Sequence, residues 1–233
     1  MTPSSDAAAL TQAFYDRWTG VYDLLARRTP RLGAIRGDAA AALASRPGDV
    51  VVEFGCGTGA NFPHLRERVG PGGTVVGVDF APGMLARARR RVDAAGWANV
   101  HVVRGDATRP PVARADAVFA SFLSGMLPDP AATLESWLDA LAPRRVALLD
   151  LARSTGAGRP LNPLFALLVV ASAPQGVRTL LRRDDSATRR LDRRVAAAHR
   201  ALFDACRESR HETRAGGFVY LSAGAVRGRQ DRP

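Results

Sequence analysis

A glycine-rich segment at residues 50–59 does most to constrain the fold of this chain. It reads Val-Val-Val-Glu-Phe-Gly-Cys-Gly-Thr-Gly. The three valines predict a buried strand that ends in an acid, Glu53. Glycines then follow at alternate positions, and glycine lets a backbone approach a ligand closely because it tolerates positive φ and has no Cβ. We expect a helix from about Thr58, whose first N–H groups are free to meet a polar ligand. The segment therefore predicts a strand–loop–helix unit that binds a ligand.

Two interpretations fit this unit by itself. The pattern Gly55-x-Gly57-x-x-Ala60 also satisfies the dinucleotide fingerprint of dehydrogenases. A second expected strand, residues 74–79, ends in Asp79, which is placed to accept the two hydroxyls of a ribose. A third, residues 100–104, is followed by another acid, Asp106.

The succession of motifs resembles the class I S-adenosylmethionine-dependent methyltransferases. It consists of Glu-x-Gly-x-Gly-x-Gly, the acid at residue 79, Ala-Pro-x-Met-Leu at 81–85 and Gly-Asp-Ala at 105–107. A dehydrogenase has no use for an acid at position 106 beside the adenine. The resemblance implies S-adenosylmethionine as the cofactor.

At the methionine end of the cofactor, the resemblance implies roles for five residues. Gly55, Gly57 and Gly59 would line it, and Glu53 would hold the site near its amino group. Ser121 would lie near the sulfonium and the transferred methyl group. The alternative is structural, with the glycines forming only a tight turn.

At the nucleoside end, the resemblance implies five more. Asp79 would bind the ribose, Phe80 and Met84 would pack on the adenine, and Asp106 would accept from the adenine amino group with Ala107 alongside. As alternatives, Met84 is a core residue and Asp106 a loop or capping acid.

The whole pattern predicts an α/β fold with a Rossmann-like, seven-stranded, mostly parallel sheet, an antiparallel last strand and helices on both faces. The expected strands are 49–54, 74–79, 100–104, 116–121, 145–151, 210–214 and 218–222. We expect a single methyltransferase domain over residues 1–233. Its parts are a helical N-terminal cap (1–45), a cofactor-binding core (46–151), an acceptor-capping insertion (152–185) and a C-terminal helix and hairpin (186–233).

Within the N-terminal cap, apolar residues recur at helical spacing from Phe14 to Leu25. Two Tyr-Asp pairs in this segment resemble the opening of quinone C-methyltransferases and bacterial phospholipid N-methyltransferases. There the segment folds over the cofactor, and Tyr15 or Tyr22 would do so here. A plain packing helix is the alternative.

The insertion contains a short apolar run, residues 164–171, which is too short to span a bilayer. In the family it resembles, this region caps the acceptor pocket. An apolar cap suits a lipid-like acceptor or shallow contact with a membrane, and a core helix is the competing interpretation.

No residue is clearly marked as a general base. A neutral amine needs none, whereas a phenol or carbon acid does. The candidates are His64, Tyr15, Tyr22 and His199, and a surface or core role is the alternative for each histidine. No metal-ligand spacing occurs. The segment Ser-Phe-Leu-Ser after the fourth strand differs from the Asn-Pro-Pro-Tyr type, which disfavours methylation of nucleic acid bases.

The formal net charge is +11, and all 33 basic residues other than histidine are arginine. Codon bias of a GC-rich genome explains this as well as attraction to an anionic partner does. With no apolar N-terminal leader, we expect a cytoplasmic enzyme with peripheral contact with the anionic inner face of the membrane. Its acceptor is predicted to be small or lipid-like, of the phospholipid amine or quinone type. The alternatives are a soluble natural product, or RNA bound through the basic surface; the oligomeric state stays open.

Overall fold

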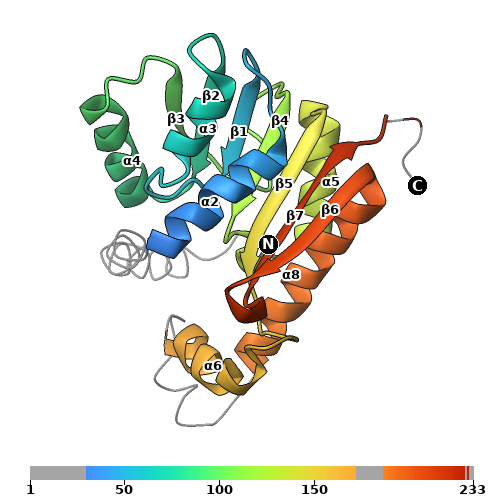
Figure 1. Ribbon diagram of the computed structural model, residues 1–233. Coiled ribbons are helices and arrows are strands. Elements are labelled where there is room, and N and C mark those ends of the chain that lie inside the picture. Colours follow the sequence, from blue (N-terminus) through green and yellow to red (C-terminus); the bar gives the residue numbers. More distant parts are fainter. Residues whose placement is uncertain (1–29, 172–185, 229, 231–233) are drawn as a thin grey trace, which may run out of the picture.

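The computed structural model describes residues 30–171, 186–228 and 230. These residues form a seven-stranded sheet of order β3-β2-β1-β4-β5-β7-β6 (Figure 1). The strands are β1 (Val50–Phe54), β2 (Thr74–Asp79), β3 (Val100–Arg104), β4 (Ala117–Ser121), β5 (Arg145–Leu151), β6 (Cys206–Arg214) and β7 (Val219–Val226). The first five pair in parallel, so their carboxyl ends meet at one edge of the sheet. β7 runs antiparallel to both β5 and β6, as predicted.

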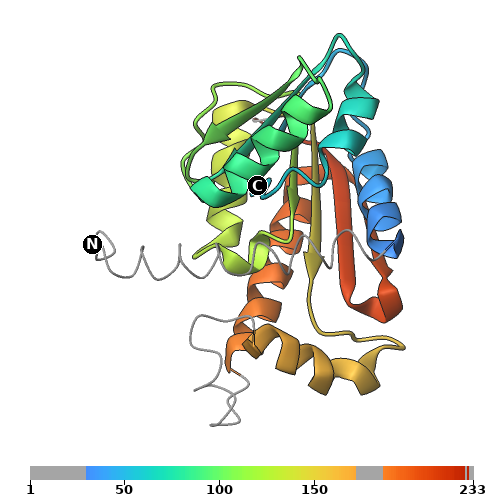
Figure 2. The ribbon, with the colours of Figure 1, turned by 90° about the vertical axis from the view of Figure 1, so that its left-hand side faces the viewer.

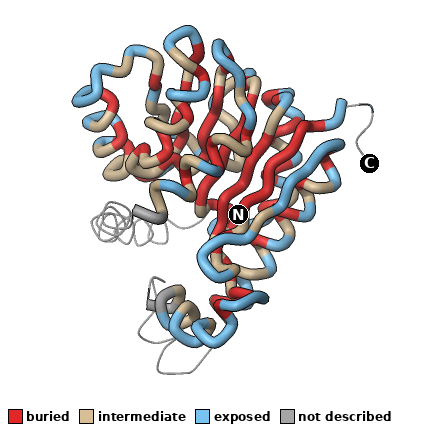
Figure 3. Tube along the Cα trace, in the orientation of Figure 1, coloured by how far each residue is buried: buried red, intermediate tan, exposed pale blue. Residues whose placement is uncertain are grey.

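Helices cover both faces of the sheet (Figure 2). On one face, α2 (Pro30–Leu43), α3 (Phe62–Val69) and α4 (Pro82–Ala94) share an apolar core with the strands. On the other, α5 (Pro130–Leu141) and α8 (Ser186–Ala205) do so. The central strands are buried along their length, whereas β6 at the edge is mostly exposed (Figure 3). The predicted fold class is confirmed.

The insertion lies beyond the carboxyl end of β5. Its described part consists of a 3-10 turn, η2 (Arg159–Leu161), and α6 (Asn162–Ala171), which extends away from the sheet (Figure 1). Within the described ranges, no helix combines the length and apolarity that crossing a membrane requires.

Element boundaries agree closely with the sequence where local signals are strong. The five parallel strands start within one residue of expectation. α5 begins where the sequence offers Asp129 as a cap, with Pro130 in its first turn and the Asp129 carboxylate accepting from the Ala132 N–H at 3.0 Å. The closing strands are both longer than the predicted 210–214 and 218–222, and the 3-10 turn η3 (Ala215–Gly217) joins them.

The expected helix start at Thr58 is wrong. α3 begins at Phe62, because Gly59 has a φ of +73° and cannot belong to a right-handed helix. The glycine loop therefore extends to Asn61. The loop, and not the first turn of α3, follows β1 at the carboxyl edge of the sheet. Tyr15, Tyr22 and most of the predicted N-terminal cap lie outside the described residues, as does the end of the insertion.

Candidate functional site

Three polar side chains meet at the carboxyl edge of the sheet, between β1, β4 and the glycine loop. Asn61 donates through Nδ2 to Glu53 Oε1 at 2.5 Å and to Ser121 Oγ at 2.8 Å. Glu53 is fully buried, and the other two are 2% and 9% exposed. We call these residues the Glu53 cluster.

The Glu53 cluster has two buried oxygen atoms that the described protein leaves without a hydrogen-bond partner. They are Glu53 Oε2 and Asn61 Oδ1. Nearly all buried polar atoms in folded proteins are paired, so two such acceptors in one cluster indicate a missing donor. Burial raises the pKa of Glu53 to about 8, although Asn61 and the nearby Arg36 charge lower it. The site thus favours a ligand that brings N–H donors and a positive charge.

Asp79 joins the glycine loop to the start of α4. Its Oδ2 accepts from the Gly57 N–H and its Oδ1 from the Ala81 N–H, both at 2.9 Å. Burial raises the pKa of Asp79 above its usual value, and these backbone hydrogen bonds oppose the shift. A carboxylate has about four acceptor positions, so each oxygen can also receive a hydroxyl.

Two of the loop glycines serve different purposes. A Cβ at Gly59 would lie 2.5 Å from the Phe62 ring, so this glycine allows α3 to close onto the loop. A Cβ at Gly57 would meet nothing within 4 Å, although its φ is +53°. The backbone at Gly57 therefore borders open space, as a surface that receives a ligand would.

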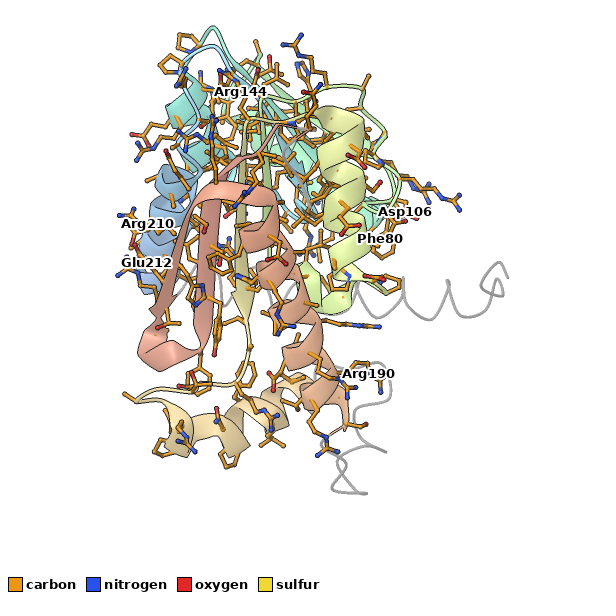
Figure 4. The ribbon with its side chains drawn as sticks, turned by 90° about the vertical axis from the view of Figure 1, so that its right-hand side faces the viewer. Phe80, Asp106, Arg144, Arg190, Arg210 and Glu212 are labelled. Carbon is orange, nitrogen blue, oxygen red and sulfur yellow. The ribbon has the colours of Figure 1, made fainter. Side chains whose placement is uncertain are left out.

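The predicted nucleoside residues lie after β2 and β3, which are neighbours in the sheet (Figure 4). Phe80 is 47% exposed, and Met84 is half-buried. Asp106 is exposed, and its Oδ1 accepts from the Thr108 N–H and Oγ at 2.8 Å each. Ala107 is held by its carbonyl oxygen, which accepts from Trp137 Nε1 at 2.6 Å. Asp106 thus orders its own loop through Oδ1, and its Oδ2 makes no hydrogen bond among the described residues.

The two described base candidates lie in different surroundings. His64 is half-buried in the first turn of α3, with its ring 3.6 Å from where a Cβ of Gly37 would project from α2. Burial lowers its pKa. His199 lies on the buried face of α8, where its ring contacts Asp150 and Ser222. The structure brings neither histidine into hydrogen-bonding contact with the Glu53 cluster.

Sequence reasoning missed two residues of the site. Asn61 links Glu53 to Ser121, and the displaced helix start hid its role. Arg36 comes from α2, is 6% exposed, and lies with its Cζ 5.6 Å from the Phe122 ring centroid. No local pattern marks Arg36, because only the packing of α2 on β4 and β5 brings it to the site.

Comparison with known proteins agrees with this geometry. Residues 51–144 match the family model described as a methyltransferase domain. The nocamycin O-methyltransferase of Saccharothrix syringae is 35% identical over 159 residues, which cover 64% of this chain and 50% of that protein. The aklanonic acid methyltransferase DauC of a Streptomyces strain is 34% identical over 145 residues, covering 60% and 64%. The chain thus spans between half and two thirds of these relatives.

A solved structure matches over most of its length. The magnesium protoporphyrin IX methyltransferase of Synechocystis, solved with bound S-adenosylhomocysteine, superposes with a TM-score of 0.59 at 16% identity, covering 84% of this chain and 83% of that one. At this identity the match shows the fold alone. Together the matches agree with the expected class: residues 51–144 match a methyltransferase domain model, and the chain shares the fold of a methyltransferase solved with S-adenosylhomocysteine bound.

Proposed function

We propose that this protein transfers a methyl group from S-adenosylmethionine to an apolar, lipid-like acceptor of the phospholipid amine or quinone type. The observation that carries the cofactor half is the pair of unpartnered acceptors in the Glu53 cluster. The observation that carries the acceptor half is the exposed apolar surface of α6, beyond the carboxyl edge.

The donor set of the cofactor fits the residues present. Its amino group supplies a positive charge and N–H donors for Glu53 Oε2 and Asn61 Oδ1. The ribose hydroxyls of the cofactor suit Asp79. The open space at Gly57 leaves room for the cofactor to approach the loop backbone closely. We assign Phe80 and Met84 to the adenine ring, Asp106 and Ala107 to its edge, and Ser121 to the region of the sulfonium.

When bound, the cofactor supplies an activated methyl group on sulfur. The protein's task is then to hold an acceptor atom in line with that methyl and to exclude water, and such positioning alone supplies several kcal/mol. Glu53 and Asn61 fix one end of the cofactor, while Asp79 fixes the other through contacts already ordered by the Gly57 and Ala81 amides.

Three large apolar side chains near α6 face solvent. Leu161, Leu164 and Leu167 are 57%, 63% and 48% exposed. A patch of this kind, rimmed by polar groups, is typical of a binding surface rather than of ordinary protein surface. We propose that it meets the apolar part of the acceptor or the membrane that contains it.

Arginines lie in the elements next to this patch. Arg159 lies in η2, and Arg190 and Arg193 are exposed near the start of α8, the helix that packs against α6 (Figure 4 labels Arg190). Apolar side chains with a cationic rim bind anionic lipid surfaces, because both burial and charge favour contact. The net charge of +11 adds to this attraction.

Vesicles test the proposal directly. Purified protein is mixed with phosphatidylcholine vesicles with and without phosphatidylglycerol, and binding is read by flotation. We expect binding to the anionic vesicles and at least tenfold weaker binding when Leu161, Leu164 and Leu167 are all changed to Ser. Arg190→Ala should weaken binding, whereas Arg210→Ala on the distant strand β6 serves as the matched control.

Labelled methyl transfer to vesicles that contain phosphatidylethanolamine or a quinol then identifies the acceptor. Absence of vesicle binding, together with RNA binding that falls steeply with salt, would contradict the lipid-like acceptor and favour RNA.

A second candidate acceptor is a soluble natural product. The observation in its favour is the match to methyltransferases named for nocamycin and aklanonic acid. An apolar α6 surface serves either acceptor. Methyl transfer to a soluble aromatic polyketide, unaffected by vesicles and by the α6 serine substitutions, would favour this candidate.

A further inference from the structure

The outer edge of the sheet is the strand β6, which carries a run of alternating charge. Residues 207–214 read Arg-Glu-Ser-Arg-His-Glu-Thr-Arg. Glu212 is half-buried, and the other seven residues of this run are exposed. Within the described ranges, β6 pairs with β7 alone, so no strand lies on its other side. An exposed strand edge is a template for pairing with another chain.

The side chains of β6 divide between the two faces of the sheet. Those at positions 208, 210, 212 and 214 face α2, since Arg214 Nη2 lies 3.9 Å from Asp38 Oδ2 of that helix. Those at positions 209, 211 and 213 face α8, since the centroid of the His211 ring is 5.9 Å from that of Phe203. The four charged side chains from 208 to 214 therefore lie side by side on the α2 face.

The backbone of β6 points outward at three positions. Phe218 and Val226, at the two ends of β7, bond to residues at the two ends of β5. In an antiparallel strand, successive residues direct their N–H and C=O groups to opposite sides. The odd-numbered residues of β7 therefore bond to β6, where their partners are the four charged residues. The backbone groups that point away from β7 belong to the remaining three residues, Ser209, His211 and Thr213.

We propose that β6 pairs with the β6 strand of a second copy of this chain, antiparallel and centred on His211. This inference goes beyond the proposed function and does not depend on it. Ser209 would face the partner's Thr213, and His211 the partner's His211, through the outward backbone groups. Because the same strand is used by both copies, the result is a closed two-fold dimer rather than a chain of copies.

The charges on the α2 face favour this register. Opposite Arg210 lies the partner's Glu212, and opposite Arg214 lies the partner's Glu208; Figure 4 labels Arg210 and Glu212 beside α2. These are non-hydrogen-bonded positions, where facing side chains come closest, and opposite charges there stabilise the pairing. The two-fold axis repeats both pairs, so each of the four charged side chains meets an opposite charge.

The neighbouring registers place like charges together. A shift of two residues keeps the outward backbone groups paired. In one direction it sets Arg210 against the partner's Arg210, and in the other it sets Glu212 against the partner's Glu212. Like charges directly opposite each other destabilise a strand pair. Larger shifts leave fewer residues in contact, so the sequence of β6 specifies one pairing.

No interaction within the single chain strongly opposes this pairing. Glu212 contacts both Arg210 and Arg214 of its own strand. Both arginines are exposed, and exposed ion pairs contribute little, so cross-strand pairs can replace them. Burial and the neighbouring His199 lower the pKa of His211, so the two rings that meet at the axis are neutral at neutral pH.

The dimer keeps the leucine patch at α6 free. Antiparallel pairing turns the carboxyl edges of the two sheets in opposite directions. α6 extends beyond that edge in each chain (Figure 1), so the two patches lie at opposite ends of the dimer. One vesicle surface therefore meets one patch, and Arg210→Ala stays a valid control for vesicle binding.

Sedimentation equilibrium of the full-length protein tests the dimer, from about 1 μM to about 1 mM. We expect the mass to rise to twice the 24.8 kDa of one chain. Arg210→Glu puts a like charge opposite the partner's Glu212 on both sides of the axis, and should weaken association by about tenfold or more. Arg90→Glu is the matched control, because it makes the same charge change at an exposed position of α4, beside the opposite edge strand β3.

A mixing experiment tests the register. Glu212→Arg makes the converse change and should weaken association as much as Arg210→Glu does. An equimolar mixture of the two variants should recover a dimer with one chain of each kind, because every charge on one strand then meets an opposite charge on the other. Thr213→Pro removes an outward N–H and spares the bonds to β7, so it should prevent pairing while the far-UV circular dichroism stays unchanged.

Three results would overturn the inference. They are a wild-type protein that is monomeric at about 1 mM, a dimer that Arg210→Glu weakens no more than Arg90→Glu does, and a mixture that fails to associate. None of them bears on methyl transfer. A protein that dimerises as expected and methylates no acceptor would contradict the proposed function alone.

Discussion

The Glu53 cluster and the histidine network (Ser124, Asp150, His199, Ser222 and His211) are both polar groups at the sheet, buried except for His211, yet they differ in how far the protein satisfies their hydrogen bonds. In the described structure, Glu53 Oε2 and Asn61 Oδ1 have no partner. Each buried side-chain oxygen and nitrogen of Ser124, Asp150, His199 and Ser222 has one. Leaving a buried polar atom unpaired costs about 1–3 kcal/mol.

This difference separates a binding site from an internal network. The Glu53 cluster has two buried acceptors without a partner, and a cation with N–H donors, as we propose, would satisfy them. The histidine network is complete by itself, so its stabilising effect is already present in the folded protein. Changes to the first should therefore affect binding, and changes to the second should affect stability.

The largest expected effect on stability comes from Asp150→Ala. It removes the acceptor of three donors, the Ser124 N–H, the Ser124 hydroxyl and His199 Nε2–H. We expect the free energy of unfolding in urea to fall by about 3 kcal/mol or more. Asp106→Ala, at an exposed acid, should change it by about 0.5 kcal/mol or less. Equal stability of the two variants would refute the contrast between network and surface.

Glu53→Gln should have the next largest effect, and on binding rather than stability. Glutamine keeps an acceptor for Asn61 but loses the charge, and a hydrogen bond to a charged group contributes about 1.5–3 kcal/mol. We expect S-adenosylhomocysteine to bind about 10- to 100-fold more weakly by calorimetry. Unchanged affinity would mean that the unpartnered oxygens do not face the cofactor's amino group.

Glu53→Gln should weaken cofactor binding, but it should make the ligand-free protein less sensitive to rising pH. The folded-state pKa of Glu53, about 8, lies above its ordinary value of 4.5. The neutral carboxyl is therefore favoured by folding below pH 4.5, and this advantage is lost as the pH rises to about 8. Ligand-free Glu53→Gln should lose less stability than the wild type over this interval, as thermal unfolding at several pH values will show.

Lowering the pH should also weaken the affinity of the wild-type protein for the cofactor. In the proposed site the carboxylate form of Glu53 would bind the cofactor's positive charge, so below its pKa of about 8 binding would release a proton. The dissociation constant of S-adenosylhomocysteine should then rise by up to about tenfold for each pH unit below that value. Calorimetry in two buffers of different ionisation enthalpy measures the proton released. A flat profile in the wild type, matching that of Glu53→Gln, would exclude Glu53 as the coupled group.

Much of the fold could be predicted from the sequence, but only part of the difference between the Glu53 cluster and the histidine network could. Runs such as Val50–Phe54 are local signals, and the strand there was confirmed; the cap at Asp129 is a local signal of the same kind. β6 was underestimated because its exposed edge carries the polar sequence Cys-Arg-Glu-Ser-Arg-His-Glu-Thr-Arg, with no apolar alternation. The histidine network was not predictable as a unit. Positions 124, 150, 199, 211 and 222 meet only because β7 inserts between β5 and β6.

The smallest expected effects come from one chemical change made in both regions, serine to alanine at 121 and at 222. Ser121→Ala leaves Asn61 its bond to Glu53 and removes one partner, so we expect about 1 kcal/mol less stability. Ser222→Ala removes the partner of both His199 Nδ1 and His211 Nδ1. Only the His199 atom is buried, so the free energy of unfolding should fall by about 1–3 kcal/mol. Affinity for S-adenosylhomocysteine should fall measurably in Ser121→Ala alone, because Asn61 is held less firmly. If Ser222→Ala weakened that affinity as much as Ser121→Ala, the two regions would be one coupled site, and the division between binding and stability would not hold.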